Sequence, residues 1–180
     1  MTQQLTVELQ CIAAFTRLEE LILFSARLPD LQPLVVLREL RALALVLNTH
    51  LVDESLRVLA GFTKLQELVL SECSNLTDDA LVHVGTSVQL RLLGLMNLPI
   101  TDAGLMHLAP LLDLRDLALQ CHSVTKNGLE HLCARLDCLV LDDKWIARQD
   151  IKPPFRTRLR TTLPRQFKRY FEVHQKSLEL

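Results

Sequence analysis

Leucines recur along the chain in the pattern Leu-x-x-Leu-x-Leu, and successive copies start 22, 25, 25, 24 and 22 residues apart. The last two leucines of each copy alternate with other residues, a period of two that is typical of a β-strand. The copies are Leu18/Leu21/Leu23, Leu40/Leu43/Leu45, Leu65/Leu68/Leu70, Leu90/Leu93/Leu95, Leu114/Leu117/Leu119 and Leu136/Leu139/Leu141. A repeat of this length predicts six strands, each followed by a turn and a short helix.

Apolar residues three positions apart lead into most of these strands. This spacing places three of them on one side of a short helix and passes the fourth to the strand that follows. In the fourth unit Ser87 takes the third position, and we expect Val88 to replace it in the core. The regular sets include Leu9/Ile12/Phe15/Leu18, Leu31/Leu34/Leu37/Leu40, Leu56/Leu59/Phe62/Leu65 and Leu105/Leu108/Leu111/Leu114.

Threonine and aspartate mark the starts of the later helices. Thr77, Thr101 and Thr125 can each accept a hydrogen bond from a free backbone N–H group. Acids beside the first two are favoured by the positive end of the helix dipole. The apolar residues that precede these starts should point inward, and they are Leu51, Leu76, Ile100 and Val124.

The segments NLTDDALVHV and PITDAGLMHLAPLLDLRDLALQC resemble the cysteine-containing subclass of leucine-rich repeats found in F-box proteins and related adaptors. The shared features are a Thr-Asp-x-Gly/Ala-Leu helix start and a Cys or Asn soon after the strand. Asn48 and Cys73 take that second position, where a buried side chain can satisfy turn backbone groups, whereas Asn97 and Cys121 come one residue earlier. The resemblance covers roughly residues 5–143. It implies a right-handed α/β solenoid with parallel strands on the concave face, helices on the convex face, and protein binding without a reaction. We expect no F-box ahead of the repeats.

Eighteen residues alternate with the buried leucines and should face the concave side in three columns. None is basic, and the middle column is wholly apolar or small. Contiguous apolar patches mark contact sites, so we expect a protein partner there. The alternatives are the chain's own tail, or tight curvature without an occupant. The residues expected to bind the partner are Ile22, Phe24, Val46, Glu67, Val69, Leu92, Met96, Asp116 and Val140.

Charge divides the chain into two parts. Residues 1–143 hold 10 Lys+Arg against 18 Asp+Glu, a net −8, and residues 144–180 hold 10 against 3, a net +7. We expect the first part to form the solenoid. The second should be a cap over the last repeat, begun by Trp145, followed by a basic amphipathic helix from Pro164.

The second part of the chain also suggests another function. Basic side chains interleaved with aromatic ones can contact phosphates and stack on bases. An RNA-binding subunit of a ribonucleoprotein is therefore the alternative to an adaptor or structural subunit that binds protein. Its contacts would come from Arg156, Arg158, Arg160, Arg165, Phe167, Lys168, Arg169, Tyr170 and Phe171.

No combination of residues points to catalysis, because a Gly-rich phosphate loop, Gly-x-Ser-x-Gly and His-Glu-x-x-His do not occur. Cys121-His122 with Cys133 and Cys138 could suggest zinc, but their spacing matches no zinc finger. We expect structural cysteines, no metal, no cofactor and no small-molecule substrate. A histidine column should form a solvated or half-buried stripe on the outer helical surface, and it consists of His83, His107 and His131.

Cysteine usage and hydropathy bear on the compartment. Five cysteines, an odd number, and no secretory signal predict an intracellular protein with reduced thiols, in a compartment that the sequence does not specify. No apolar run reaches the ~18 residues of a membrane span. We therefore expect no membrane association.

Overall fold

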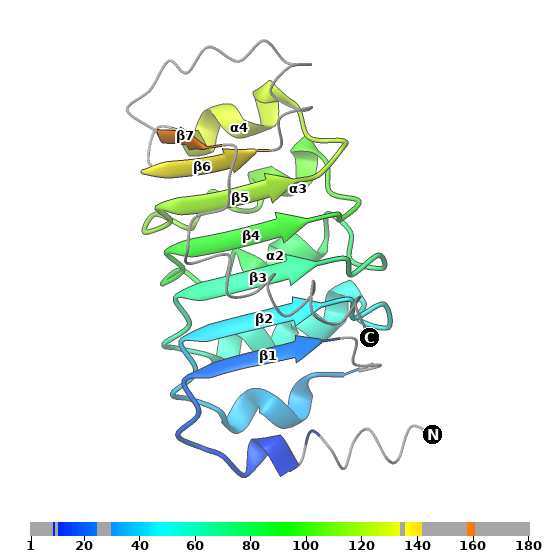
Figure 1. The fold of residues 1–180 in the computed structure, drawn as a ribbon, viewed down its shortest axis with the longest axis vertical. Helices are drawn as coiled ribbons and strands as arrows, with labels where there is room; N and C mark the ends of the chain where they lie inside the picture. Colours follow the sequence, from blue (N-terminus) through cyan, green and yellow to red (C-terminus); the bar gives the residue numbers. More distant parts are fainter. Residues whose placement is uncertain (1–8, 10, 25–29, 134–135, 142–157, 161–180) are drawn as a thin grey trace.

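The computed structural model describes residues 9, 11–24, 30–133, 136–141 and 158–160. In this part of the chain the leucine repeats form one parallel sheet whose strands alternate with short helices (Figure 1). The α/β class and the parallel pairing predicted from the sequence are confirmed. The arrangement is compatible with a solenoid.

Six strands occur where the leucine pattern places them, and most of these are five residues long. They are β1 (Glu20–Phe24), β2 (Ala42–Val46), β3 (Glu67–Ser71), β4 (Leu92–Met96), β5 (Asp116–Gln120) and β6 (Cys138–Leu141). A further strand, β7 (Arg158–Arg160), lies outside the pattern. The helices are η1 (Gln32–Val36), η2 (Asp53–Gly61), α2 (Ala80–Val84), α3 (Asp102–Met106) and α4 (Lys126–Cys133).

The order of the strands in the sheet is the same as their order in the chain. The expected six-stranded sheet is wrong in number, because β7 adds a seventh strand at the edge of β6, where Leu139 pairs with Leu159. The leucine pattern does not predict this strand. An edge strand can be paired through backbone N–H and C=O groups alone, so the added strand needs no buried side chains of its own.

The core lies between the sheet and the helices. The two central leucines of β3 and β4, such as Leu68 and Leu93, are fully buried there together with the helix-side residues. The η1 and η2 segments are 3₁₀-helices. A 3₁₀-helix has three residues per turn, so apolar residues three apart lie on one line along it. This explains why Leu34, Leu59 and Phe62 are all buried.

Two core expectations are wrong. Phe15 is 65% exposed, since no described unit precedes the first one and offers a surface for its ring. In the fourth unit Val88 is 51% exposed and Ser87 is buried. The turn after α2 continues in steps of three, with Ser87 N–H donating to Val84 C=O and Leu90 N–H donating to Ser87 C=O, so position 87 faces the core whatever its side chain.

The helix starts follow the expectation and add links between units. Thr101 begins α3, and its hydroxyl accepts a hydrogen bond from Ala103 N–H at 3.2 Å. The residues expected to point inward beside these starts are confirmed as buried, and they are Leu51, Leu76, Ile100 and Val124.

The acids at these starts also have a role beyond the one expected from the sequence, because each carboxylate accepts two hydrogen bonds from the threonine of the next unit. One comes from its backbone N–H and one from its hydroxyl. The pairs are Asp53 with Thr77, Asp78 with Thr101, and Asp102 with Thr125.

Candidate interaction surface

The residues between the buried leucines form three columns across the sheet, as the sequence predicts. In the middle column Ile22 pairs with Ala44, Ala44 with Val69, Val69 with Gly94, and Gly94 with Ala118. Because side chains alternate along a strand, these residues lie on the side of the sheet opposite the leucines that pack on the helices. We name this side the distal face.

A second apolar cluster lies on the distal face, separate from the core. It consists of Ala44, Val46, Val69, Leu92, Met96 and Ala118, with Phe24 and Leu47 packed against it. Its six members are between 0% and 5% exposed. They come from β2, β3, β4 and β5, so the cluster runs across the centre of the sheet.

Acidic residues flank the cluster in the first column. Glu20, Glu67 and Asp116 stand at equivalent positions of β1, β3 and β5. Glu67 and Asp116 are half-buried, and Glu20 is exposed. Each of the three takes part in a further interaction within the protein, so none of them is without a partner. The distal face therefore combines an apolar centre with a row of negative charge.

The predicted partner-binding residues are brought together, but in two groups of different accessibility. Val46, Val69, Leu92 and Met96 are buried, which sequence alone does not indicate. Ile22 on the outer strand β1 is 38% exposed. The half-buried members are Phe24, Glu67 and Asp116, and the remaining one, Val140, lies in β6 at a position whose side chain is outside the description.

Most residues of the basic tail lie outside the described residues, as does Trp145. Arg158 and Arg160 form part of β7, in register with Cys138 and Val140 of β6. The other residues of the RNA hypothesis that the structure does not describe are Arg156, Arg165, Phe167, Lys168, Arg169, Tyr170 and Phe171.

The turns after the strands confirm the role predicted for Asn48 and Cys73. Asn48 Nδ2 donates to the carbonyl oxygens of Leu23 (2.8 Å) and Val46 (3.0 Å), and Cys73 Sγ donates to those of Leu45 and Ser71 at 3.5 Å each. These buried side chains thus satisfy carbonyl groups at the ends of the strands.

Backbone geometry explains why Cys121 has the same role although it comes one residue earlier. Leu47, Glu72 and Asn97, which follow β2, β3 and β4, have φ angles of 56°, 54° and 51°. Cys121 follows β5 without such a left-handed residue, and its Sγ donates to Leu95 C=O at 3.5 Å. Omitting the left-handed residue brings the cysteine into the buried position one residue sooner.

Burial raises the pKa of the Cys73 and Cys121 thiols to about 11, against weaker lowering by nearby backbone hydrogen bonds. A thiol is nucleophilic and binds metal as the thiolate, so both groups are held in their unreactive form at neutral pH. Within the described residues no group of three or more His, Cys, Asp and Glu side chains is placed to hold a metal ion.

The histidine column lies on the helical side as expected. His83 and His131 are half-buried, and His107 is exposed. A ring nitrogen of His131 lies 3.0 Å from the Leu105 carbonyl oxygen of the preceding unit. This contact gives His131 a structural partner.

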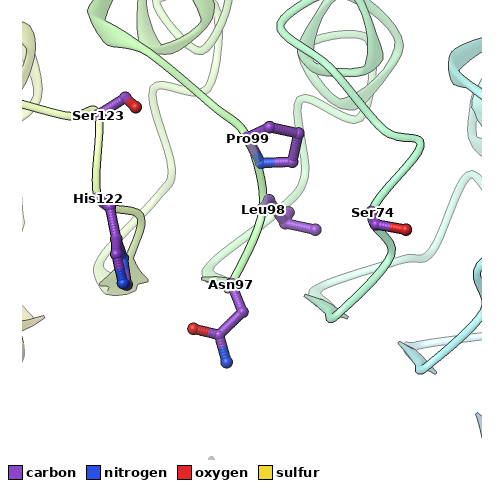
Figure 2. A pocket seen from close by; sticks show the side chains of 6 residues that line it. All are labelled: Ser74, Asn97, Leu98, Pro99, His122 and Ser123. Atoms are coloured by element: carbon purple, nitrogen blue, oxygen red, sulfur yellow. The ribbon is translucent and has the colours of Figure 1, made fainter.

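A shallow hollow of about 390 Å³ lies among the turns after β3, β4 and β5. Figure 2 shows Asn97 and His122 extending from neighbouring turns in the same direction. Its lining also includes Ser74, Leu98, Pro99 and Ser123. These six residues include no carboxylate and no cysteine.

None of the helices in the described part of the chain has the length and apolarity that crossing a bilayer requires.

No protein-family model matches the sequence, and no curated protein matches it significantly.

Proposed function

We propose that this chain is a non-enzymatic protein-interaction module, an adaptor or structural subunit of a larger assembly, that binds a protein partner through the distal face. Its architecture is that of a right-handed leucine-rich-repeat solenoid, with the distal face as the concave side and a basic C-terminal extension. The cysteine and asparagine positions after the strands and the Thr-Asp helix starts support this relationship.

One observation carries the proposal, the apolar cluster on the distal face. These side chains lie on the side of the sheet away from the helices, so their removal from water, which lowers the free energy, requires another surface over them. The acidic row beside the cluster gives the distal face a negative potential, which favours a partner that carries positive charge. The surface therefore suits a polypeptide segment that presents apolar side chains flanked by Lys or Arg.

The test reverses charge on the distal face without touching the buried cluster. The double variant Glu67→Lys/Asp116→Lys is compared with Asp113→Lys/Glu130→Lys, which makes the same change at two exposed positions, a turn and α4. Tagged full-length chains are purified from the native cell after cross-linking. A photoreactive residue in place of Ile22 identifies proteins that touch the distal face directly.

We expect one or more proteins to be recovered with the wild-type and control chains, to cross-link through position 22, and to be lost with the distal-face variant. Recovery of the same proteins with the distal-face variant would contradict the proposal. Loss of all co-purifying material after ribonuclease treatment would favour the RNA-binding alternative.

A further inference from the structure

Burial on the distal face is more complete than the described elements explain. Val69 and Ala118, in the middle column, are 0% exposed. All the described helices lie on the other side of the sheet (Figure 1). Side chains of an uncovered sheet face stand roughly perpendicular to the sheet and keep contact with water. Complete burial therefore requires a covering layer on the distal face.

The burial of the middle column shows where such a layer lies. Ala44, Val69 and Ala118 are fully buried, whereas Ile22 in the same column is 38% exposed. The covered area thus includes β2, β3, β4 and β5, and burial is lower at β1. Three strand spacings separate β2 from β5, a distance of about 14 Å.

Residues 161–180 have the position and length to reach this area. They follow directly after β7, which pairs with β6, so they leave the sheet two strand spacings away from β5. A helix of about 14 residues is about 21 Å long. Such a helix would span the covered strands from the β6 side.

The chemistry of the same segment also fits. Phe167, Tyr170 and Phe171 are spaced three and four residues apart, which places them on one side of a helix. Lys168 and Arg169 lie between them in the sequence. The apolar side of such a helix matches the apolar cluster. Its flanking cations match the negative charge of Glu20, Glu67 and Asp116, each of which has an interaction partner in the structure.

We propose that residues 161–180 of the same chain bind across the distal face in the isolated protein, with the aromatic side of the segment on the apolar cluster. The segment then occupies the surface assigned above to a protein partner. That partner must displace it, a consequence that rests on the proposed function. The intramolecular contact itself does not, and it is tested without any partner.

The first test measures the accessibility of the covered face in the full-length chain. A cysteine is introduced by Ala118→Cys, and its alkylation by a maleimide is followed by peptide mass spectrometry. Val88→Cys is the matched exposed control. We expect position 118 to react at least ~10-fold more slowly than position 88, since reaction requires local opening of the segment.

The segment is then perturbed by Phe167→Asp/Phe171→Asp in the Ala118→Cys chain, with far-ultraviolet circular dichroism to verify folding. Position 118 should now react at a rate close to that of position 88. Equal rates at the two positions in the unperturbed chain, or unchanged protection of position 118 after the double replacement, would overturn the proposal.

The second test needs no disruptive variant. Benzoylphenylalanine replaces Phe171, and the isolated protein is irradiated at low concentration. We expect cross-links within one chain to strands β2–β5, Met96 included. Cross-links to another part of the same chain, or only between two chains, would overturn the intramolecular assignment.

Discussion

The carboxylate of Asp78 lies against Gly104 in the space that a Cβ atom at position 104 would occupy. The same carboxylate accepts hydrogen bonds from Thr101 N–H at 2.8 Å and from the Thr101 hydroxyl at 2.5 Å. One unit further on, Asp102 lies in the same way against Gly128. The glycine in these helix starts is therefore required by the neighbouring unit's aspartate, not by backbone conformation, since neither glycine has a positive φ angle.

Removing the Asp78 carboxylate should weaken the contact between two units. Asp78→Ala leaves the partly buried Thr101 N–H without its acceptor, at a cost of about 1–3 kcal/mol in the free energy of unfolding. Asp79→Ala is the control, because this exposed neighbour makes no bond to the next unit. Urea denaturation measures both. A loss for Asp78→Ala no greater than for Asp79→Ala would show that the link does not stabilise the fold.

Adding a methyl group at position 104 should lower the stability of the fold, whereas a Gly→Ala change inside a helix usually raises it. In an unobstructed helix Gly→Ala stabilises by up to about 1 kcal/mol. In Gly104→Ala the new Cβ meets the Asp78 carboxylate and must displace it. We expect a net loss of about 1–3 kcal/mol, as for other overpacked sites. In the Asp78→Ala background, Gly104→Ala should cost little additional stability, because the carboxylate that obstructs the new Cβ is gone. A double variant whose loss of stability equals the sum of the two single losses would contradict the steric explanation.

Ser87 should be a site where a simple substitution stabilises the protein. Its hydroxyl is buried, and its Oγ has no hydrogen-bond partner in the described part of the chain. Ser87→Ala removes this unpaired polar group and should raise the free energy of unfolding by about 1 kcal/mol. Ser74→Ala, at an exposed serine, should change it by less than about 0.5 kcal/mol. A clear loss of stability for Ser87→Ala would indicate that the hydroxyl is hydrogen-bonded.

The buried thiols should be protected from alkylation and should destabilise the fold at high pH. Cys11 is exposed and should react with iodoacetamide in the native protein, whereas Cys73 and Cys121 should react only after unfolding. Their folded-state pKa of about 11 lies above the ordinary value of 9.0. Between pH 9 and 11 the unfolded chain therefore releases thiol protons that the folded chain keeps. The stability contributed by these groups is complete below pH 9 and is lost as the pH rises through this window.

A comparison of variants isolates the thiol contribution to this alkaline loss. The wild type and the Cys73→Ala/Cys121→Ala variant are unfolded in urea at pH 8 and pH 10.5. The wild type should lose more stability across this range, by an amount on the order of 1–2 kcal/mol per thiol. Equal losses in the two chains would show that the thiols titrate alike in the folded and unfolded states.

The repeat period accounts for the parts of the fold that the sequence predicts. Leucines such as Leu68 and Leu93 mark the strands because both are buried against the helices, and the three columns follow from the alternation of side chains along each strand. The inward role of Asn48 and Cys73 is likewise readable, since each comes two residues after its strand, where carbonyl groups at the strand ends need a donor.

Other features depend on contacts that no local pattern encodes. The β7 strand pairs through its backbone, and its three residues include only one apolar residue, Leu159, which is too few to form a recognisable pattern. The alternation of side chains along the strands predicts that Val69 and Leu92 lie on the distal face. It does not predict that they are buried, because their burial depends on what lies over that face. The aspartate links could have been found, because each Asp and Thr are 23 or 24 residues apart and repeat three times.

The identical order of strands in the sheet and in the chain gives the molecule a direction along which stability is graded. Each strand pairs only with the strands of adjacent units, so an opening at one end of the sheet does not break strand pairs at the other. The first unit is only partly buried, with Phe15 65% and Ile22 38% exposed. We therefore expect β1 to open more readily than the buried central strands, and opening from this end to proceed one unit at a time.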